Sequence, residues 1–114
     1  GNAFPFLSKG FEALMRDNIP QITLDQIFHF VLEGRRPGSF VRAIFENDLR
    51  TAVAQADREN QAALADIVRF VQSNVPMDVL NHSVDDWVQE GGAEGRYSES
   101  TARYVAENLG AVGA

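Results

Sequence analysis

The sequence predicts an all-α fold, a compact bundle of about five helices in one domain that spans residues 1–114. Three observations lead to this prediction. Apolar residues recur at helical spacing in several stretches, helix-capping residues and Pro or Gly separate these stretches, and the composition, 45% apolar and 23% charged, is ordinary for a globular protein. A chain of 114 residues is long enough to bury a core without a metal or a disulfide.

The predicted centre of the bundle is a helical hairpin over residues 40–56 and 58–73. The apolar side of its first helix contains Val41, Ile44, Phe45, Leu49, Ala52, Val53 and Ala56. Ser39 is the expected N-cap of this helix, and Asp57 is expected to end it and to cap the second helix. Because so short a break permits only a tight connection, we expect the two helices to pack antiparallel.

Asp48 interrupts the pattern, since it projects into the apolar stripe between Phe45 and Leu49. A buried carboxylate without partners is very costly, so we expect Asp48 to be hydrogen-bonded, paired or protonated. One interpretation is that it caps a neighbouring helix or pairs with Arg35 or Arg36. The other is that it is a ligand-binding or catalytic acid.

Two further features belong to this predicted polar core or site. Arg35 and Arg36 precede a helix N-terminus, where they either hold an anion or lie in a solvated turn. Asn60 is the third residue of the second helix, where its side chain is expected to reach back to the N–H of the cap.

The chain before the hairpin contains two apolar segments. Residues 4–17 are rich in aromatics, among them Phe4 and Phe6, and form either an arm that docks on another subunit or a helix that closes the core. Residues 24–32 show the cleanest helical periodicity, with a capping box at Thr23 and a C-cap at Gly34. Phe30 lies off that stripe, so Phe4, Phe6 and Phe30 are the predicted interaction surface.

The chain after the hairpin is expected to form two shorter helices. Ser83 is expected to cap the first, and Trp87 is expected to anchor it on the core. Ser98 is expected to cap the last helix, over residues 99–108. Residues 91–95 are predicted to be a flexible Gly-rich break, residues 110–114 a frayed tail, and residues 1–3 a scar of tag removal.

The central stretch carries a resemblance to a known group of proteins. Pro37-Gly38-Ser39-Phe40, Asn47-Asp48-Leu49 and Ala56-Asp57-Arg58-Glu59-Asn60 resemble a pattern in small bacteriophage and prophage proteins of unknown function. The likeness covers residues 22–76. It implies an origin in a phage or prophage and action in the cytoplasm of the bacterial host, and it implies no catalytic residue.

Composition and motifs argue against several classes of function. The chain has no cysteine, which excludes thiol nucleophiles and cysteine zinc sites. Its two histidines, His29 and His82, lack the spacing of a metal site, so no metal and no cofactor are expected. No apolar run reaches the ~20 residues of a membrane span. The net charge of −6 argues against nucleic acid as a partner.

We therefore predict a non-enzymatic phage or prophage protein that acts by binding a phage or host protein. A homodimer is a further expectation, since amphipathic helices in so small a domain commonly leave an apolar strip for self-association. The alternative is a small helical DNA-binding regulator, in which residues 58–73 are the recognition helix.

Overall fold

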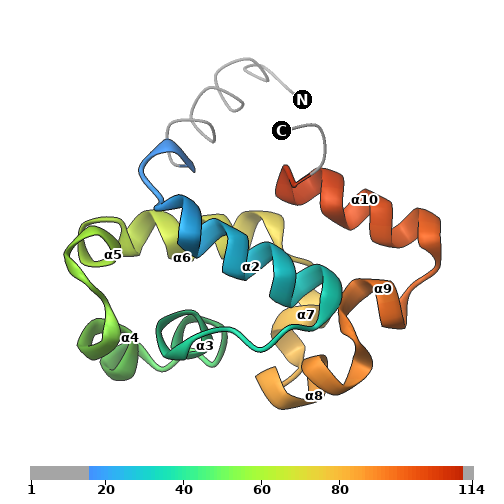
Figure 1. The fold of residues 1–114 in the computed structure, drawn as a ribbon, viewed down its shortest axis with the longest axis horizontal. Helices are drawn as coiled ribbons and strands as arrows, with labels where there is room; N and C mark the ends of the chain where they lie inside the picture. The colour runs from blue at the N-terminus through green and yellow to red at the C-terminus, as the bar shows by residue number, and fades with distance from the viewer. Residues whose placement is uncertain (1–15, 112–114) are drawn as a thin grey trace.

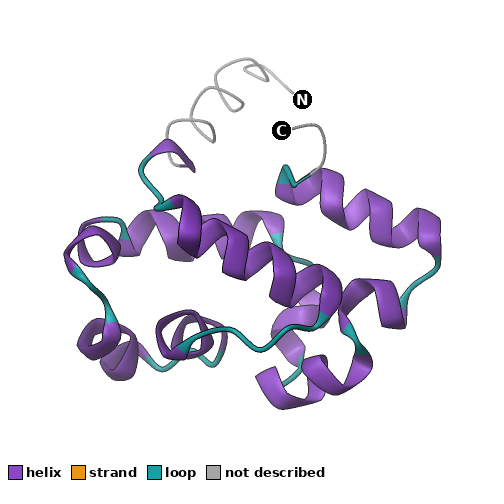
Figure 2. Cartoon of the chain, in the orientation of Figure 1, coloured by secondary structure: helices purple, strands orange, loops and turns teal. Residues whose placement is uncertain are grey.

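The computed structural model of the chain describes residues 16–111, and these residues form helices and no strand (Figures 1 and 2). The helices are α2 (Gln21–Glu33), α3 (Ser39–Phe45), α4 (Leu49–Gln55), α5 (Arg58–Ala62), α6 (Leu64–Asn74), α7 (Met77–Asn81), α8 (Val84–Glu90), α9 (Gly92–Arg96) and α10 (Glu99–Leu109). The all-α prediction is therefore confirmed for this part of the chain.

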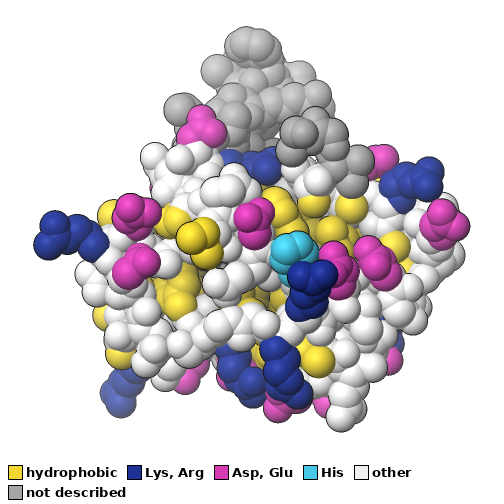
Figure 3. Space-filling view, in the orientation of Figure 1, with side chains coloured by type: hydrophobic (Ala, Val, Ile, Leu, Met, Phe, Trp, Pro, Cys, Tyr) yellow, Lys and Arg dark blue, Asp and Glu magenta, His cyan; other side chains and the backbone are white. Residues whose placement is uncertain are grey.

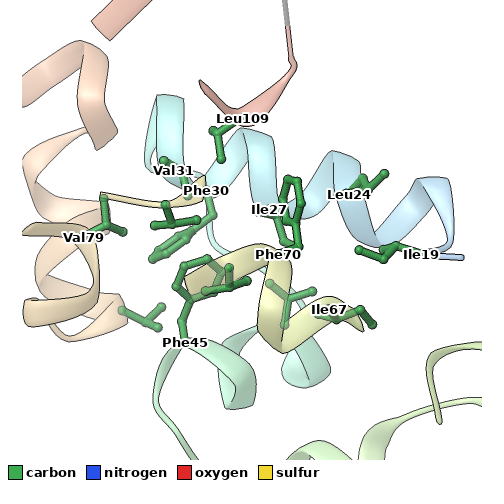
Figure 4. Close-up of a cluster of buried hydrophobic side chains, with 14 of the residues drawn as sticks. Ile19, Leu24, Ile27, Phe30, Val31, Phe45, Ile67, Phe70, Val79 and Leu109 are labelled. Carbon is green, nitrogen blue, oxygen red and sulfur yellow. The ribbon is translucent and has the colours of Figure 1, made fainter. Parts of the chain in front are cut away.

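Helix α2 runs across the middle of the molecule and carries the centre of the core (Figure 1). It packs against α3, α8, α9 and α10. Figure 4 shows the core side chains, with Leu24, Ile27, Phe30 and Val31 on α2, Phe45 on α3, and Ile67 and Phe70 on α6. A helix with neighbours on several sides buries more than one face.

That arrangement overturns the predicted role of Phe30. Its side chain is only 1% exposed, and its ring packs edge-on against the ring of Phe45, with 4.8 Å between the centroids. Phe30 is thus a core residue of a single chain and not part of an interaction surface. Phe4 and Phe6, the other two residues of the predicted surface, lie outside the described residues.

The predicted central hairpin is not found as such. Residues 40–56 do not form one helix, because the chain leaves the helical path at residues 46–48 and divides the run into α3 and α4. Residues 58–73 are divided at Ala63, whose φ of −98° and ψ of 5° separate α5 from α6. The sequence predicts about five helices, whereas residues 16–111 contain nine helices, most of them shorter than predicted.

Three of the predicted N-caps are confirmed and two are wrong. The side-chain oxygens of Asp57, Ser83 and Ser98 each accept a hydrogen bond from the backbone N–H three residues later, at 2.9, 3.1 and 3.2 Å. The residues at the N-caps of α2 and α3 are Pro20 and Gly38, so the predicted caps Thr23 and Ser39 lie inside the first turns. Gly34 is the C-cap of α2, as predicted, in the left-handed conformation.

Trp87 anchors α8 on the core, as the sequence predicts. Its side chain is fully buried, and its indole N–H donates a 3.1 Å hydrogen bond to the backbone carbonyl of Val31. This carbonyl belongs to the last turn of α2, where backbone oxygens have no partner within the helix. One side chain thus supplies apolar contact area and satisfies a buried acceptor.

Residues 91–95, the predicted flexible break, instead form most of helix α9, which packs against the end of α2. Gly92 is buried there with a φ of +73°. A Cβ atom on Gly92 would lie 2.4 Å from the backbone nitrogen of Gly34 and 2.6 Å from the carbonyl of Leu32. Glycine is needed because two backbones meet here, and not to provide flexibility.

The predicted frayed tail is described only in part. Gly110 is the C-cap of α10. Residues 112–114, like the predicted tag scar at residues 1–3, lie outside the described residues.

We expect Gly92→Ala to lower the free energy of unfolding by roughly 1–3 kcal/mol, because the methyl group meets backbone atoms that cannot rotate away and the φ is strained. Urea denaturation followed by circular dichroism measures this change. Gly38→Ala is the matched control: its Cβ would meet only the flexible side chain of Gln26, at 3.2 Å. Equal stability of the two variants would contradict the close packing of α9 on α2.

Candidate functional site

An apolar groove of about 240 Å³ lies where the end of α3 and the start of α4 face α6 and α7. Its apolar lining consists of Ala43, Ile44 and Phe45 from α3, Leu49 and Ala52 from α4, Val68 and Val71 from α6, and Leu80 from α7. Its polar lining consists of Asn47, Asp48 and Gln72. We call this hollow the α4 groove.

The break between α3 and α4 forms one wall of the groove, and its geometry follows from two residues. Asn47 has a φ of +57°, which is the left-handed region that asparagine tolerates better than most residues. Asp48 then becomes the N-cap of α4, and its Oδ1 accepts from the backbone N–H of Thr51 at 3.2 Å. Its own backbone N–H donates to the carbonyl of Ala43 at 2.9 Å, which closes the turn.

The break resolves the conflict that Asp48 creates in the sequence. In one continuous helix its carboxylate would lie in an apolar stripe, where burial without a partner is very costly. In the observed fold Asp48 is exposed and caps the following helix. This agrees with the first interpretation of Asp48, in which it caps a neighbouring helix. The expectation that Asp48 is part of a buried polar core is wrong, because the chain breaks the helix and so keeps the carboxylate in water.

The break also leaves two large apolar side chains outside the core. Leu49 and Val53 belong to the predicted buried stripe, yet they are 66% and 46% exposed. Within α4 only Ala52 is buried. Since Leu49 and Val53 are four residues apart on one helix, they form a short apolar ridge beside the groove.

Arg35 and Arg36 do not lie with Asp48. The guanidinium of Arg35 pairs with Glu33 at 2.8 Å, and that of Arg36 pairs with Asp85 at 2.6 Å. Asp85 also accepts two 3.3 Å hydrogen bonds from Arg42. The hydrogen bonds from Arg36, and then those from Arg42, lower the pKa of Asp85. Arg36 and Arg42 therefore join the loop after α2 and helix α3 to the start of α8. The predicted partnership of Arg35 or Arg36 with Asp48 is wrong.

Asn60 lies in a different place and has a structural role. Its side-chain oxygen accepts a 2.7 Å hydrogen bond from the hydroxyl of Thr23, which is the one buried polar residue of the described chain. The predicted reach of the Asn60 side chain to its helix cap is wrong; it is the backbone N–H of Asn60 that donates to Asp57. The Thr23–Asn60 bond holds α5 on the first turn of α2 and satisfies a hydroxyl that burial would otherwise leave without a partner.

A second polar cluster, which the sequence did not predict, joins α7 to α9. The carboxylate of Asp78 accepts hydrogen bonds from Arg96 Nε at 2.7 Å and from the hydroxyl of Tyr97. Arg96 also pairs with Glu90, and the ring nitrogen Nδ1 of His82 lies 2.6 Å from the carbonyl oxygen of Asp78. No local sequence pattern predicts this cluster, because its members come from three helices and the turns that follow two of them.

The electrostatics of the cluster are those of a structural clamp. The hydrogen bond from Arg96, followed by the one from Tyr97, lowers the pKa of Asp78. Burial, followed by the hydrogen bond to Asp78, raises the pKa of Tyr97 to about 12. Tyr97 is thus fixed as a neutral donor and Asp78 as an ionised acceptor, which suits a persistent contact better than proton transfer near neutral pH.

Residues 16–111 contain neither a helix that could span a membrane nor a cluster of side chains that could hold a metal ion. The helices there are too short or too polar to cross a bilayer. The same residues contain no group of three or more His, Asp or Glu side chains placed to hold a metal ion.

Comparison with known protein families, with curated proteins and with solved structures gives no match to this chain. The α4 groove is therefore the feature of residues 16–111 from which a function can be inferred.

We expect Asp48→Ala to lower the free energy of unfolding by about 1 kcal/mol, because alanine cannot accept the hydrogen bond from the first turn of α4. Asp48→Asn keeps an acceptor of the same shape and is expected to be nearly as stable as the unchanged chain. Urea denaturation of the three proteins tests this. Equal stability of Asp48→Ala and the unchanged chain would show that the cap does not stabilise the break.

The Asp78 clamp predicts a pH-dependent contribution to stability. Because the folded pKa of Asp78 lies below the unfolded value, the carboxylate stabilises the fold fully above an unfolded pKa of 3.8. This contribution is lost as pH falls through the lower folded pKa. We therefore expect Asp78→Asn to be less stable than the unchanged chain at neutral pH, with a difference that shrinks in acid. Asp86→Asn is the control, and urea midpoints as a function of pH give the measurement. A difference that stays constant with pH would contradict the clamp.

Proposed function

We propose that this chain is a protein-binding module, and that its α4 groove receives an amphipathic helix of another protein. In this proposal it is a non-enzymatic accessory protein of a bacteriophage or prophage, and its partner is a phage or host protein in the bacterial cytoplasm. The observation that carries the proposal is the apolar ridge of Leu49 and Val53 beside a groove whose lining is mainly apolar.

The ridge is unfavourable in the isolated chain. Full burial of a leucine or valine side chain stabilises a fold by roughly 1.5–3 kcal/mol, and most of this is forfeited at Leu49. A continuous helix over residues 40–56 would not have required Asn47 to take a left-handed conformation either. Binding sites are typical places where an unfavourable backbone conformation and exposed apolar side chains occur side by side.

A helix is the segment that suits this groove. The walls are themselves helices, so the groove is bounded by α3 and α4 on one side and by α6 and α7 on the other. Helix-in-groove recognition places apolar residues at positions i, i+3, i+4 and i+7 of the bound helix into such a hollow. Val53, the second residue of the ridge, extends the apolar contact area beyond the groove lining, to which Leu49 already belongs.

The stretch with the predicted resemblance to phage proteins overlaps the same surface. Residues 22–76 include every residue that lines the groove except Leu80. The resembling pattern also contains Asn47-Asp48-Leu49, which are the residues that form the break and begin the ridge.

The charge distribution favours protein over nucleic acid as the partner. On the face shown in Figure 3, Lys and Arg side chains are dispersed among Asp and Glu and do not gather into one basic patch. The predicted recognition helix over residues 58–73 is divided at Ala63 into two shorter helices. A nucleic-acid site needs several cations that face phosphates together.

The double variant Leu49→Gln plus Val53→Gln tests the proposal, because it makes the ridge polar without adding charge. Tagged chain is incubated with lysate of a phage host, with and without nuclease, and captured proteins are identified. We expect one protein to be captured in both conditions by the unchanged chain and to be lost, or reduced at least tenfold, with the double variant.

Met77→Gln is the matched control, since Met77 is an equally exposed apolar residue, 69% exposed, on α7. It is expected to capture the partner as the unchanged chain does. Capture that disappears with nuclease would favour the DNA-binding alternative. Capture that the double variant retains would contradict the α4 groove as the binding site.

A further inference from the structure

We infer that the helix received by the α4 groove is basic, and that one of its Lys or Arg side chains pairs with Asp48. This inference rests on the proposed function and specifies the chemistry of the partner at the same site. It follows from the charge of the groove and from the present partners of the neighbouring cations.

Among residues 16–111, Asp48 is the only charged residue that lines the groove. Its Oδ1 accepts the 3.2 Å hydrogen bond from the N–H of Thr51, and the carboxylate forms no ion pair with any cation of residues 16–111. The remaining acceptor capacity of this carboxylate therefore faces water at the edge of an apolar hollow.

The arginines near α3 are occupied elsewhere. Arg42 contacts Glu46 and Asp85, each at 3.3 Å, and Arg36 contacts Asp85 at 2.6 Å. Arg50 follows Asp48 by two residues, and side chains two apart do not face each other on a helix. Within residues 16–111, no Lys or Arg side chain pairs with Asp48.

Covering the groove changes the energetics of this carboxylate. An apolar helix that seals the hollow removes water from Asp48, and a desolvated carboxylate without a counter-charge is strongly disfavoured. A Lys or Arg on the incoming helix replaces the lost water with a charge-assisted hydrogen bond. A Glu or Asp at that position places two like charges together. The net charge of −6 further favours the approach of a cationic segment.

Three synthetic fluorescein-labelled helical peptides test the inference, with the full chain as the receptor. The peptides share one apolar leucine face and differ only in their polar face, which carries lysine, glutamine or glutamate. Fluorescence anisotropy gives the Kd of each peptide for the unchanged chain, for Asp48→Asn, and for Leu49→Gln plus Val53→Gln. Asp48→Asn keeps the acceptor that caps α4 and removes only the charge.

We expect the lysine peptide to bind the unchanged chain at least tenfold more tightly than the glutamine peptide, and the glutamate peptide to bind most weakly. Asp48→Asn is expected to weaken the lysine peptide about tenfold and to leave the glutamine peptide unchanged. Glu107→Gln, which removes one exposed carboxylate from α10, is the charge-matched control and is expected to change neither peptide.

Equal weakening of the lysine peptide by Asp48→Asn and by Glu107→Gln would overturn the inference, because the attraction would then come from the overall charge. If the glutamine peptide nevertheless binds and loses its affinity in the Leu49/Val53 variant, the proposed groove remains supported. If no peptide binds, or if binding is insensitive to the Leu49/Val53 variant, both the inference and the proposed function are overturned.

Discussion

The structure depends on the cost of placing a carboxylate in an apolar stripe. Residues 40–56 have the periodicity of one amphipathic helix, and Asp48 lies in the middle of its apolar side. The chain avoids burial of the charge by leaving the helix at Asn47 and using Asp48 to cap a new one. That single solution redirects α4, exposes Leu49 and Val53, and opens the α4 groove against α6 and α7. The same residue is therefore responsible for the local fold and for the chemistry of the candidate site.

The packing of helices around α2 stabilises the fold and so offsets the cost of the break between α3 and α4. Trp87 donates to the carbonyl of Val31 and fixes α8 to α2, and the contact between Gly34 and Gly92 lets α9 approach the backbone of α2 closely. Both contacts involve the C-terminal end of α2, away from α4. The groove is thus formed by short helices at one side of a well-packed core, where apolar surface can stay exposed without loosening the fold.

Two groups of surface charges hold helices together. Arg36, Arg42 and Asp85 join the α2–α3 region to α8, and Asp78 joins α7 to Arg96 and Tyr97. Exposed ion pairs of this kind contribute little each, but they orient short helices that bury few residues. Asp48 takes no part in these pairs and instead caps the first turn of α4.

The sequence by itself determined the all-α class, the caps at Asp57, Ser83 and Ser98, the end of α2 at Gly34 and the anchoring role of Trp87. Each depends on local hydrogen bonding or on the burial of one large side chain, and the pattern of neighbouring residues predicts both. It also drew attention to Asp48, although not to the break that this residue causes. Only the tertiary structure decided that Phe30 is core, that most of residues 91–95 belong to the packed helix α9 and that Asp78, Arg96 and Tyr97 meet. These outcomes depend on which helices surround α2 and on contacts between residues far apart in the chain, and periodicity along one helix does not contain that information.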